Sequence, residues 1–463
     1  YIKKTETPVT SVIDGCAASA ATMMSVVADH RLIHENSFML IHQLSSGMWG
    51  KFEEMKDDMK NNEMLMKKII GIYEEHTNIP KSKIKDILKN INDVLSESLQ
   101  TGWLTTGPKV RQFEKELQGI LNSKYVISVN SCTAALHLAL AAKGFGRGDK
   151  FIAPTYTFVA TLEVGEYLGM EPVLVDCDNE FNLNIDQVEQ HLKKDAKIKA
   201  IIPVHFAGKP VDMERLFSLA DKYDLFILED AAHALETISN KGKVGDTQHA
   251  VAFSFYANKN ITTGGEGGAI ATNDMALADK IRRMSLHGMS KDGWNRFKIG
   301  NKWEYDVSLL GYKYNMTDLA ASIGIWQMVH IEEWYNKRKL IVDQYNTSLN
   351  TIEGIICPTI VNKNLRDAYH LYVIRIDPLK WTVGRNEIIE LLSKNGIGTS
   401  VHYKPIHMHS YYIKKYGYKI DDYPISKKYY ENVITLPLYP SLMKEDVDYI
   451  IENICNIWEK YKS

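Results

Sequence analysis

Short apolar runs alternate with helical segments from Tyr125 onward, and this pattern limits the possible folds of the chain more than any other feature. Runs of this length, separated by stretches of helical periodicity, are typical of parallel strands that helices cover on both faces. The sequence therefore predicts an α/β fold built on a mainly parallel sheet. The runs are Tyr125–Val129, Phe151–Pro154, Pro172–Asp176, Ala200–Val204, Leu225–Asp230 and Val251–Phe255.

The C-terminal part of the chain has a different pattern. Two further strand signals, Leu371–Ile376 and Thr399–Tyr403, stand among helical segments. Helices and strands without regular alternation favour a smaller α+β domain. We therefore expect a small domain over residues 331–463. The motifs described below divide the rest of the chain into residues 1–86 and a large domain over residues 87–330.

The composition excludes several classes of partner. Lysine plus arginine number 55 against 57 aspartate plus glutamate, for a formal net charge of -2, so the chain has no basic field to attract nucleic acid. No apolar run approaches the roughly 20 residues that span a bilayer. The five cysteines are scattered and none forms a CxxC pair, which indicates reduced thiols in a cytoplasmic protein without a metal site.

Ligands of an open parallel sheet bind beyond the carboxyl ends of its strands, so the residues after each run are the first candidates for a site. After the first run, residues 130–140 form a small polar turn that opens a helix. Free amides at such a helix start can hold a phosphate, and Thr133 and Ala134 are the candidates. Serine and threonine before a helix also serve as simple N-caps, and that alternative stays open.

Asp230 ends the fifth run, and Lys259 comes shortly after the sixth. Asp230 can keep a pyridinium nitrogen protonated, or it can cap a short helix. Lys259 stands between an apolar run and a stretch rich in glycine and threonine, where desolvation can lower the pKa of its amine and let it attack an aldehyde. The alternative for Lys259 is a solvated surface turn. Ser254 would reach the same phosphate as Thr133.

Aromatic residues follow the second run. Tyr156 and Phe158 can lie on the face of a planar ring, or they can belong to the core. A phosphate cradle, a ring contact, a carboxylate and an amine then occur in chain order at the strand ends. This combination predicts a site for pyridoxal phosphate (PLP).

The motifs around these residues resemble those of the DegT/StrS family of sugar aminotransferases, over about residues 87–457. The resemblance implies the PLP-dependent transferase type I fold, with a mainly parallel seven-stranded sheet in the large domain and a small α+β domain. The motifs are, in chain order, GWLTTGPKV, NSCTAALHLAL, PTYTFVAT, PVHFAG, EDAAH, SFYANK, LHGMS, GYKYNMTD and LPLYP.

The resemblance implies a role for each candidate residue. Lys259 holds PLP through a Schiff base and moves a proton between Cα and C4′, and Asp230 pairs with the pyridinium. Tyr156 and His233 pack near the ring. Asn315 contacts the phosphate from a second subunit, so that a homodimer is needed for activity. The other phosphate contacts are Thr133, Ala134 and Ser254.

Similar enzymes take the amino group from glutamate and pass it to a nucleotide-diphospho-4-keto-6-deoxy sugar, and some act on a 3-keto sugar. Two stretches, residues 285–296 and 400–407, correspond to family loops near the sugar nucleotide. A PLP-dependent sugar dehydratase and a noncatalytic family member are the alternatives. In the dehydratases histidine replaces the Schiff-base lysine, so Lys259 favours transamination. The candidate substrate contacts are Trp294, Arg296, His402 and His407.

Residues 1–86 resemble a different family and form a partial ClpP/crotonase-like α/β segment, similar to the second half of a ClpP-type serine peptidase. Ser19 matches the nucleophile of that family and His42 the base. We expect no peptidase activity, because the first half of the domain is missing and residues 89–91 show no aspartate where the triad needs one. The likeness rests on Gly15–Ala21, Leu40–Gln43 and Ile72–Asn78.

Overall fold

The computed structural model describes residues 94–289 and 306–463, together with residues 10–13, 16–18, 28, 30–33 and 38–40. The chain divides into two compact units, Tyr1–Thr101 and Gly102–Ser463. Some candidates from the sequence lie outside the described residues, namely Ser19, His42, Trp294 and Arg296.

The described part of the first unit contains two pairs of short parallel strands. A helix at residues 94–101 ends this unit. Parallel pairing requires a crossover connection between the two strands of each pair. The pairs are β1 (Thr10–Ile13) with β3 (His30–Ile33), and β2 (Cys16–Ala18) with β4 (Phe38–Leu40).

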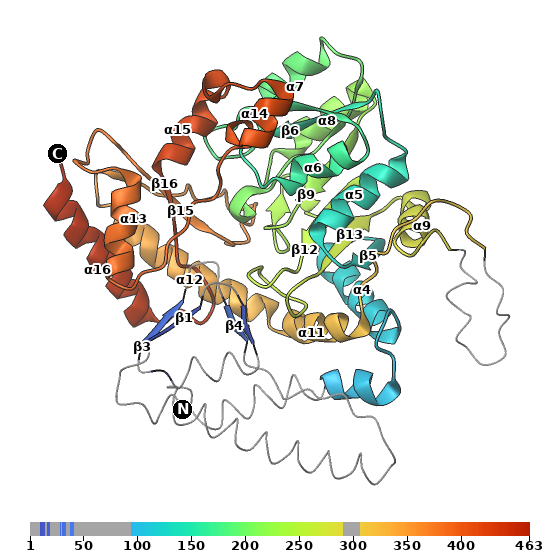
Figure 1. The fold of residues 1–463 in the computed structure, drawn as a ribbon, viewed down its shortest axis with the longest axis horizontal. Helices are drawn as coiled ribbons and strands as arrows, with labels where there is room; N and C mark the ends of the chain where they lie inside the picture. The colour runs from blue at the N-terminus through green and yellow to red at the C-terminus, as the bar shows by residue number, and fades with distance from the viewer. Residues whose placement is uncertain are drawn as a thin grey trace, which may run out of the picture. The chain divides into compact units, whose positions relative to one another are not determined.

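A seven-stranded sheet forms the centre of the second unit (Figure 1). β13 is antiparallel to both of its neighbours, and every other neighbouring pair is parallel. The predicted mainly parallel sheet is therefore confirmed. Across the sheet the order is β5 (Tyr125–Val129), β13 (Gly268–Thr272), β12 (Ala250–Ser254), β9 (Phe226–Asp230), β8 (Ile198–Ile201), β6 (Lys150–Pro154) and β7 (Glu171–Val175).

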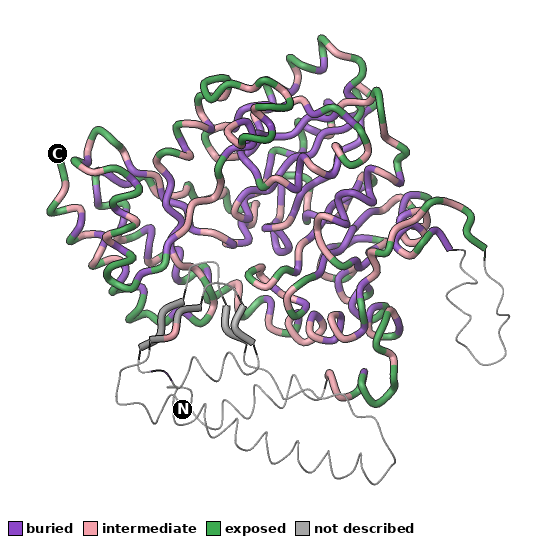
Figure 2. Tube along the Cα trace, viewed as in Figure 1, coloured by how far each residue is buried: buried purple, intermediate pink, exposed green. Residues whose placement is uncertain are grey.

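Helices cover both faces of this sheet, and the buried residues follow its strands (Figure 2). Along β12, Ala250 and Ala252 belong to one core, whereas Val251 and Phe253 belong to the other. The first core is closed by α5 (Cys132–Lys143), α6 (Ala160–Tyr167) and α9 (Met275–Met284). The opposite face is closed by α4 (Pro108–Leu121), α7 (Ile185–Leu192), α8 (Met213–Tyr223) and α11 (Asp318–Val329).

The C-terminal part is built around a three-stranded antiparallel sheet. Its strands are β14 (Ile355–Ile356), β15 (Tyr372–Ile376) and β16 (Val433–Leu436). Apolar residues of this sheet form one core with three helices, which are α12 (Ile331–Leu349), α13 (Arg385–Lys394) and α16 (Lys444–Tyr461). Two further helices, α14 (Ser410–Tyr416) and α15 (Pro424–Asn432), precede β16.

The structure differs from the sequence prediction at two strands. The prediction of a strand at Thr399–Tyr403 is wrong, because Ser400 forms only an isolated bridge with Thr435. β13 is not among the predicted runs, and Ile270 is its single large apolar residue. None of the described helices combines the length and the apolar character needed to cross a membrane.

Candidate functional site

Asp230 is the last residue of β9, and its side chain is held in a buried position. The residue is 6% exposed. Its Oδ2 accepts a hydrogen bond from Thr161 Oγ1 at 2.8 Å, and its Oδ1 accepts one from the Ala232 N–H at 3.2 Å. Burial raises the pKa of this carboxyl. The interpretation of Asp230 as a helix cap is wrong, because residues 231–237 form turns and no helix starts there.

Lys259 lies in the loop after β12, with its amine buried. Burial lowers the pKa of this amine from 10.5 to about 8, while the nearby Cys132 and Asp230 partly oppose that shift. A surface lysine would keep its ordinary pKa, so the lowered pKa favours the site interpretation over that of a solvated surface turn, although the residue as a whole is partly exposed. An amine of this pKa is partly neutral near physiological pH and can act as a nucleophile.

The start of α5 has two free amides. The side chain of Ser131 caps this helix and accepts a hydrogen bond from the Ala134 N–H at 3.1 Å. The Ala134 amide is therefore already used, which departs from the expectation that it contacts a phosphate. No described residue accepts a hydrogen bond from the N–H of Cys132 or of Thr133. These two amides, at the positive end of the helix dipole, remain available to an anion.

Gly268 allows β13 to pass close to this helix start. It pairs with Val129 on one side and with Ser254 on the other. A Cβ at this position would lie only 2.4 Å from the carbonyl carbon of Ser131, so any other residue would push the strand away. This close approach brings the end of β12, with Ser254, next to the N-terminus of α5.

Three histidines gather beside Lys259. Burial, followed by the nearby Lys259 charge, lowers the pKa values of His233, His370 and His402, and that of His402 falls to about 4. The rings of His233 and His370 lie 4.4 Å apart. His233 Nδ1 accepts a hydrogen bond from the Ala207 N–H at 3.2 Å, so its proton is on Nε2, 3.0 Å from the Tyr403 hydroxyl. The site thus contains neutral imidazoles.

Tyr156 and Phe158 lie in different surroundings. Tyr156 is fully buried, its hydroxyl donates to the His402 carbonyl oxygen at 2.7 Å, and its ring packs against Phe206. A ring enclosed in this way presents no open face to a planar ligand. Phe158 is 57% exposed and lies 6.0 Å from the Tyr403 ring. Of the two aromatic residues, only Phe158 has an accessible face.

His407 occupies a different position from the one expected. It is fully buried. Its Nδ1 lies 2.7 Å from Thr155 Oγ1, and its Nε2 donates to the Ile420 carbonyl oxygen at 3.2 Å. Both ring nitrogens are bonded inside the protein, so His407 stabilises the end of β6 and has no ring nitrogen free for a substrate. His402 has one such contact, between its Nδ1 and Thr435 Oγ1 at 2.9 Å.

Asn315 lies next to the end of β5 in its own chain. Its backbone forms a bridge with Val129. Its Nδ2 donates to Thr106 Oγ1 at 2.8 Å, and its Oδ1 accepts from Lys313 Nζ at 2.6 Å. The side chain is partly exposed, so it can contact a second copy of the chain.

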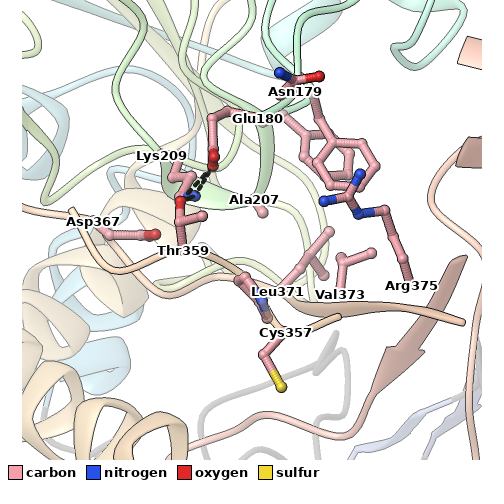
Figure 3. A pocket seen from close by; sticks show the side chains of 13 residues that line it. Asn179, Glu180, Ala207, Lys209, Cys357, Thr359, Asp367, Leu371, Val373 and Arg375 are labelled. Atoms are coloured by element: carbon pink, nitrogen blue, oxygen red, sulfur yellow. Dashed lines mark hydrogen bonds and ion pairs between the residues drawn. The ribbon is translucent and has the colours of Figure 1, made fainter. Parts of the chain in front are cut away.

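Figure 3 shows a pocket lined by residues from the large domain and from the C-terminal part. Phe206 and Ala207 line it, and both residues also contact His233. Lys209 also lines the pocket and bonds with Glu180 and Thr359 (Figure 3). This lysine is therefore already paired within the protein. Arg375 also lines the pocket, and its guanidinium lies over the Tyr429 ring, 4.5 Å from the ring centroid.

The arrangement at the strand ends has a specific chemical capacity. A buried amine of lowered pKa lies near a buried carboxylate, and free amides stand at a helix start. These groups suit a ligand that carries an aldehyde, a basic ring nitrogen and a phosphate.

The described residues contain no group of three or more side chains that could hold a metal ion. Sequence reasoning missed His370 and Tyr403, although His370 directly precedes a predicted strand run.

Comparison with known proteins identifies two matching families. The DegT/DnrJ/EryC1/StrS aminotransferase family matches residues 85–455, and the Clp protease family matches residues 1–97. The spore coat polysaccharide biosynthesis protein SpsC of Bacillus subtilis (strain 168) is 46% identical over 364 residues, which are 78% of this chain and 93% of SpsC.

Solved structures show the same fold. Spr1654 from Streptococcus pneumoniae in its PMP form superimposes with a TM-score of 0.75 at 34% identity, over 80% of this chain and 97% of the other. It is also known in a PLP form. Helicobacter pylori PseC, an aminotransferase in the biosynthesis of pseudoaminic acid, superimposes with a TM-score of 0.74 at 28% identity, over 80% of this chain and 96% of PseC.

Proposed function

Because the chain belongs to the DegT/DnrJ/EryC1/StrS aminotransferase family, we propose that it transfers an amino group from glutamate to a nucleotide-diphospho-4-keto-6-deoxy sugar. The chain is a PLP-dependent sugar aminotransferase. The observation that carries the proposal is the buried Lys259 amine, whose pKa falls to about 8, near the buried carboxylate of Asp230.

The residues at the strand ends fit PLP. We propose that Lys259 bonds the aldehyde, that Asp230 faces the ring nitrogen, and that the amides of Cys132 and Thr133 hold the phosphate with Ser254. When bound, PLP supplies an aldehyde carbon and a ring that accepts electrons. A carboxylate in a dry site stabilises a protonated ring nitrogen, because the opposite charge offsets its own cost of burial. Support for this assignment comes from the free amides and from the close approach of Gly268 to Ser131.

The remaining side chains prepare the site for proton transfer. With a pKa of about 8, the Lys259 amine can both take up and return a proton close to neutral pH. The imidazoles of His233 and His402 stay neutral there, because burial lowers their pKa values. Neutral neighbours do not repel the positive charge that Lys259 gains when it takes the proton. Phe158, which has an accessible ring face, is our candidate for the ring contact in place of Tyr156.

The product is an amino sugar for a surface glycan. Support for this part of the proposal comes from SpsC of Bacillus subtilis, whose name assigns it to the biosynthesis of a spore coat polysaccharide. We further propose a homodimer in which each site is completed by Asn315 of the partner subunit, on the basis of the family resemblance. A cytoplasmic location is supported by the free thiols of Cys132, Cys177, Cys357 and Cys455.

A panel assay tests the proposed function. The purified protein with PLP is incubated with glutamate and with nucleotide-linked 4-keto-6-deoxy and 3-keto sugars, and the amino sugars are identified by mass spectrometry. We expect one 4-keto sugar to be aminated, with formation of 2-oxoglutarate. Amination of a 3-keto sugar alone would correct the position of transfer, and amination of none would contradict the proposal.

The Clp protease match over residues 1–97 raises the question of a second activity, that of a serine peptidase. We propose that residues 1–97 have no peptidase activity and that transamination does not depend on them. A fluorophosphonate probe tests the first statement with Ser19→Ala as control, since labelling that this substitution abolishes would contradict it. Deletion of residues 1–86 tests the second, and we expect the amination rate to be retained.

A further inference from the structure

Asn260, the residue after Lys259, has a side chain held by three hydrogen bonds. Its Nδ2 donates to Glu236 Oε2 and, at 3.1 Å, to the Ala368 carbonyl oxygen. A carbonyl oxygen only accepts hydrogen bonds, so the NH2 group must face Ala368 and the Oδ1 atom must face the third partner, His370. His370 Nδ1 lies 3.0 Å from this oxygen and therefore carries the proton.

A buried ion pair fixes the other end of this network. Arg338 Nη2, on α12, donates to Glu236 Oε1, and both side chains are nearly inaccessible. A buried ion pair is stable only when further hydrogen bonds satisfy its remaining atoms. Asn260 provides such a bond to Glu236. The network thus connects α12, the turns after β9, the Lys259 loop and the segment before β15.

The proton position in His370 is opposite to that in three other buried or partly buried histidines. In each of those three, Nδ1 accepts a hydrogen bond from a backbone N–H, so the proton of the neutral ring is on Nε2. In His370 the proton is on Nδ1, and Nε2 has a lone pair. No described residue donates a hydrogen bond to this nitrogen. The three reference histidines are His205, His233 and His249.

We propose that Asn260 is a positioning residue that fixes His370 in the Nδ1–H tautomer and so provides the Lys259 site with an uncharged acceptor nitrogen, Nε2. The proposal rests on the proposed function, because the donor that we assign to Nε2 is a hydroxyl group of the sugar substrate. The contact with His233 at 4.4 Å puts His370 in this site. In the other tautomer, Nε2–H would be a donor and could not accept a hydrogen bond from a hydroxyl.

Nuclear magnetic resonance can determine the tautomer directly. Long-range ¹H–¹⁵N correlation spectra are recorded on the PLP-loaded protein with ¹⁵N-labelled histidine at pH about 8, where an ordinary histidine is neutral. The variant His370→Gln assigns the His370 signals. We expect Nδ1–H for His370 and Nε2–H for His205, the internal reference. Finding the His370 proton on Nε2 in the unmodified protein would overturn the proposal.

Substitution of Asn260 tests its control over the tautomer. Asn260→Leu should move the His370 proton to Nε2. The matched control is Asn346→Leu. It removes another buried amide, whose oxygen accepts a hydrogen bond from the Tyr372 hydroxyl at 2.7 Å. This control should leave the His370 proton on Nδ1. If Asn260→Leu folds poorly, Asn260→Ala is measured in its place, since it removes the same amide oxygen without adding bulk, and it should also move the His370 proton to Nε2. Persistence of Nδ1–H in the folded variant counts against the proposal.

Kinetics separate this proposal from the proposed function. With a keto sugar that the panel assay identifies, Asn260→Leu should lower kcat/KM for the sugar about tenfold, in line with other residues that orient a functional histidine. The affinity of the Asn260→Leu variant for PLP should stay unchanged. An unchanged kcat/KM with a shifted tautomer would refute the sugar contact. If the unmodified protein aminates no keto sugar, the proposed function fails, and the tautomer measurement still decides the role of Asn260.

Discussion

The carboxylate of Asp230 accepts a hydrogen bond from the Thr161 hydroxyl at 2.8 Å, and this bond connects the end of β9 to α6. Thr161 Oγ1 in turn lies 2.8 Å from Thr157 Oγ1. One carboxylate oxygen is therefore oriented by two side chains that precede it in the chain. A buried charge held in this way needs little reorganisation when charge develops on a bound ring.

Asp230→Asn should bind PLP but lower turnover on the order of 100-fold or more, because a neutral amide cannot keep the ring nitrogen protonated. Turnover and PLP affinity are measured on the same preparation. Asp178→Asn is the control, since Asp178 is a carboxylate outside the site, also with a raised pKa, of about 6. Near-normal turnover of Asp230→Asn would show that this carboxylate is only structural.

Tyr156→Phe and Phe158→Leu should have separate effects. The first substitution removes the hydrogen bond to the His402 carbonyl oxygen and should lower the free energy of unfolding by about 1 kcal/mol in urea titrations. The second changes an exposed residue and should alter stability by less than about 0.5 kcal/mol, but it should weaken PLP binding. If only Tyr156→Phe weakens PLP binding, Tyr156 is the ring contact after all.

The rate at which the protein without cofactor incorporates PLP should rise with pH, with a midpoint near 8. The pKa of Lys259 falls from 10.5 to about 8, so its amine is neutral, and nucleophilic, above about pH 8 and protonated below it. Stopped-flow absorbance of the bound cofactor measures this rate. A midpoint near 10 would mean that the reacting amine has the pKa of an exposed lysine.

Mixing Asn315→Ala with Lys259→Ala should restore about one quarter of the activity of the unmodified protein, because half of the dimers are then mixed and each mixed dimer has one intact site. Each variant alone should be inactive or nearly so. Subunit exchange is verified with differently tagged chains. If exchange occurs without recovery of activity, Asn315 acts within its own subunit.

The sequence alone predicted the sheet and its strand ends well, because these depend on local patterns. Asp230 ends one apolar run and Lys259 comes four residues after another. Asp230 is buried, and the lowered pKa of Lys259 indicates that its amine is desolvated. Side-chain orientation was predicted less well. The sequence does not show which of Tyr156 and Phe158 faces the interior, since both are aromatic residues beside the same run.

Contacts between distant segments could not be predicted. Glu236 and Arg338 are 102 residues apart in the chain and form a buried pair, and neither residue stands in a recognised motif. Likewise, His407 has the appearance of a site residue in the sequence, but it bonds to Thr155, 252 residues earlier. Such pairs depend on how the C-terminal part packs against the seven-stranded sheet.

We propose Lys259 as the residue to which PLP bonds. The most direct measurement is borohydride reduction of the PLP-loaded protein, followed by proteolysis and mass spectrometry of the peptides. We predict that the reduced cofactor is fixed to the peptide that contains Lys259 and that Lys259→Ala retains none. Finding the cofactor on another lysine, or on no peptide, would rule out Lys259 as the residue that bonds PLP.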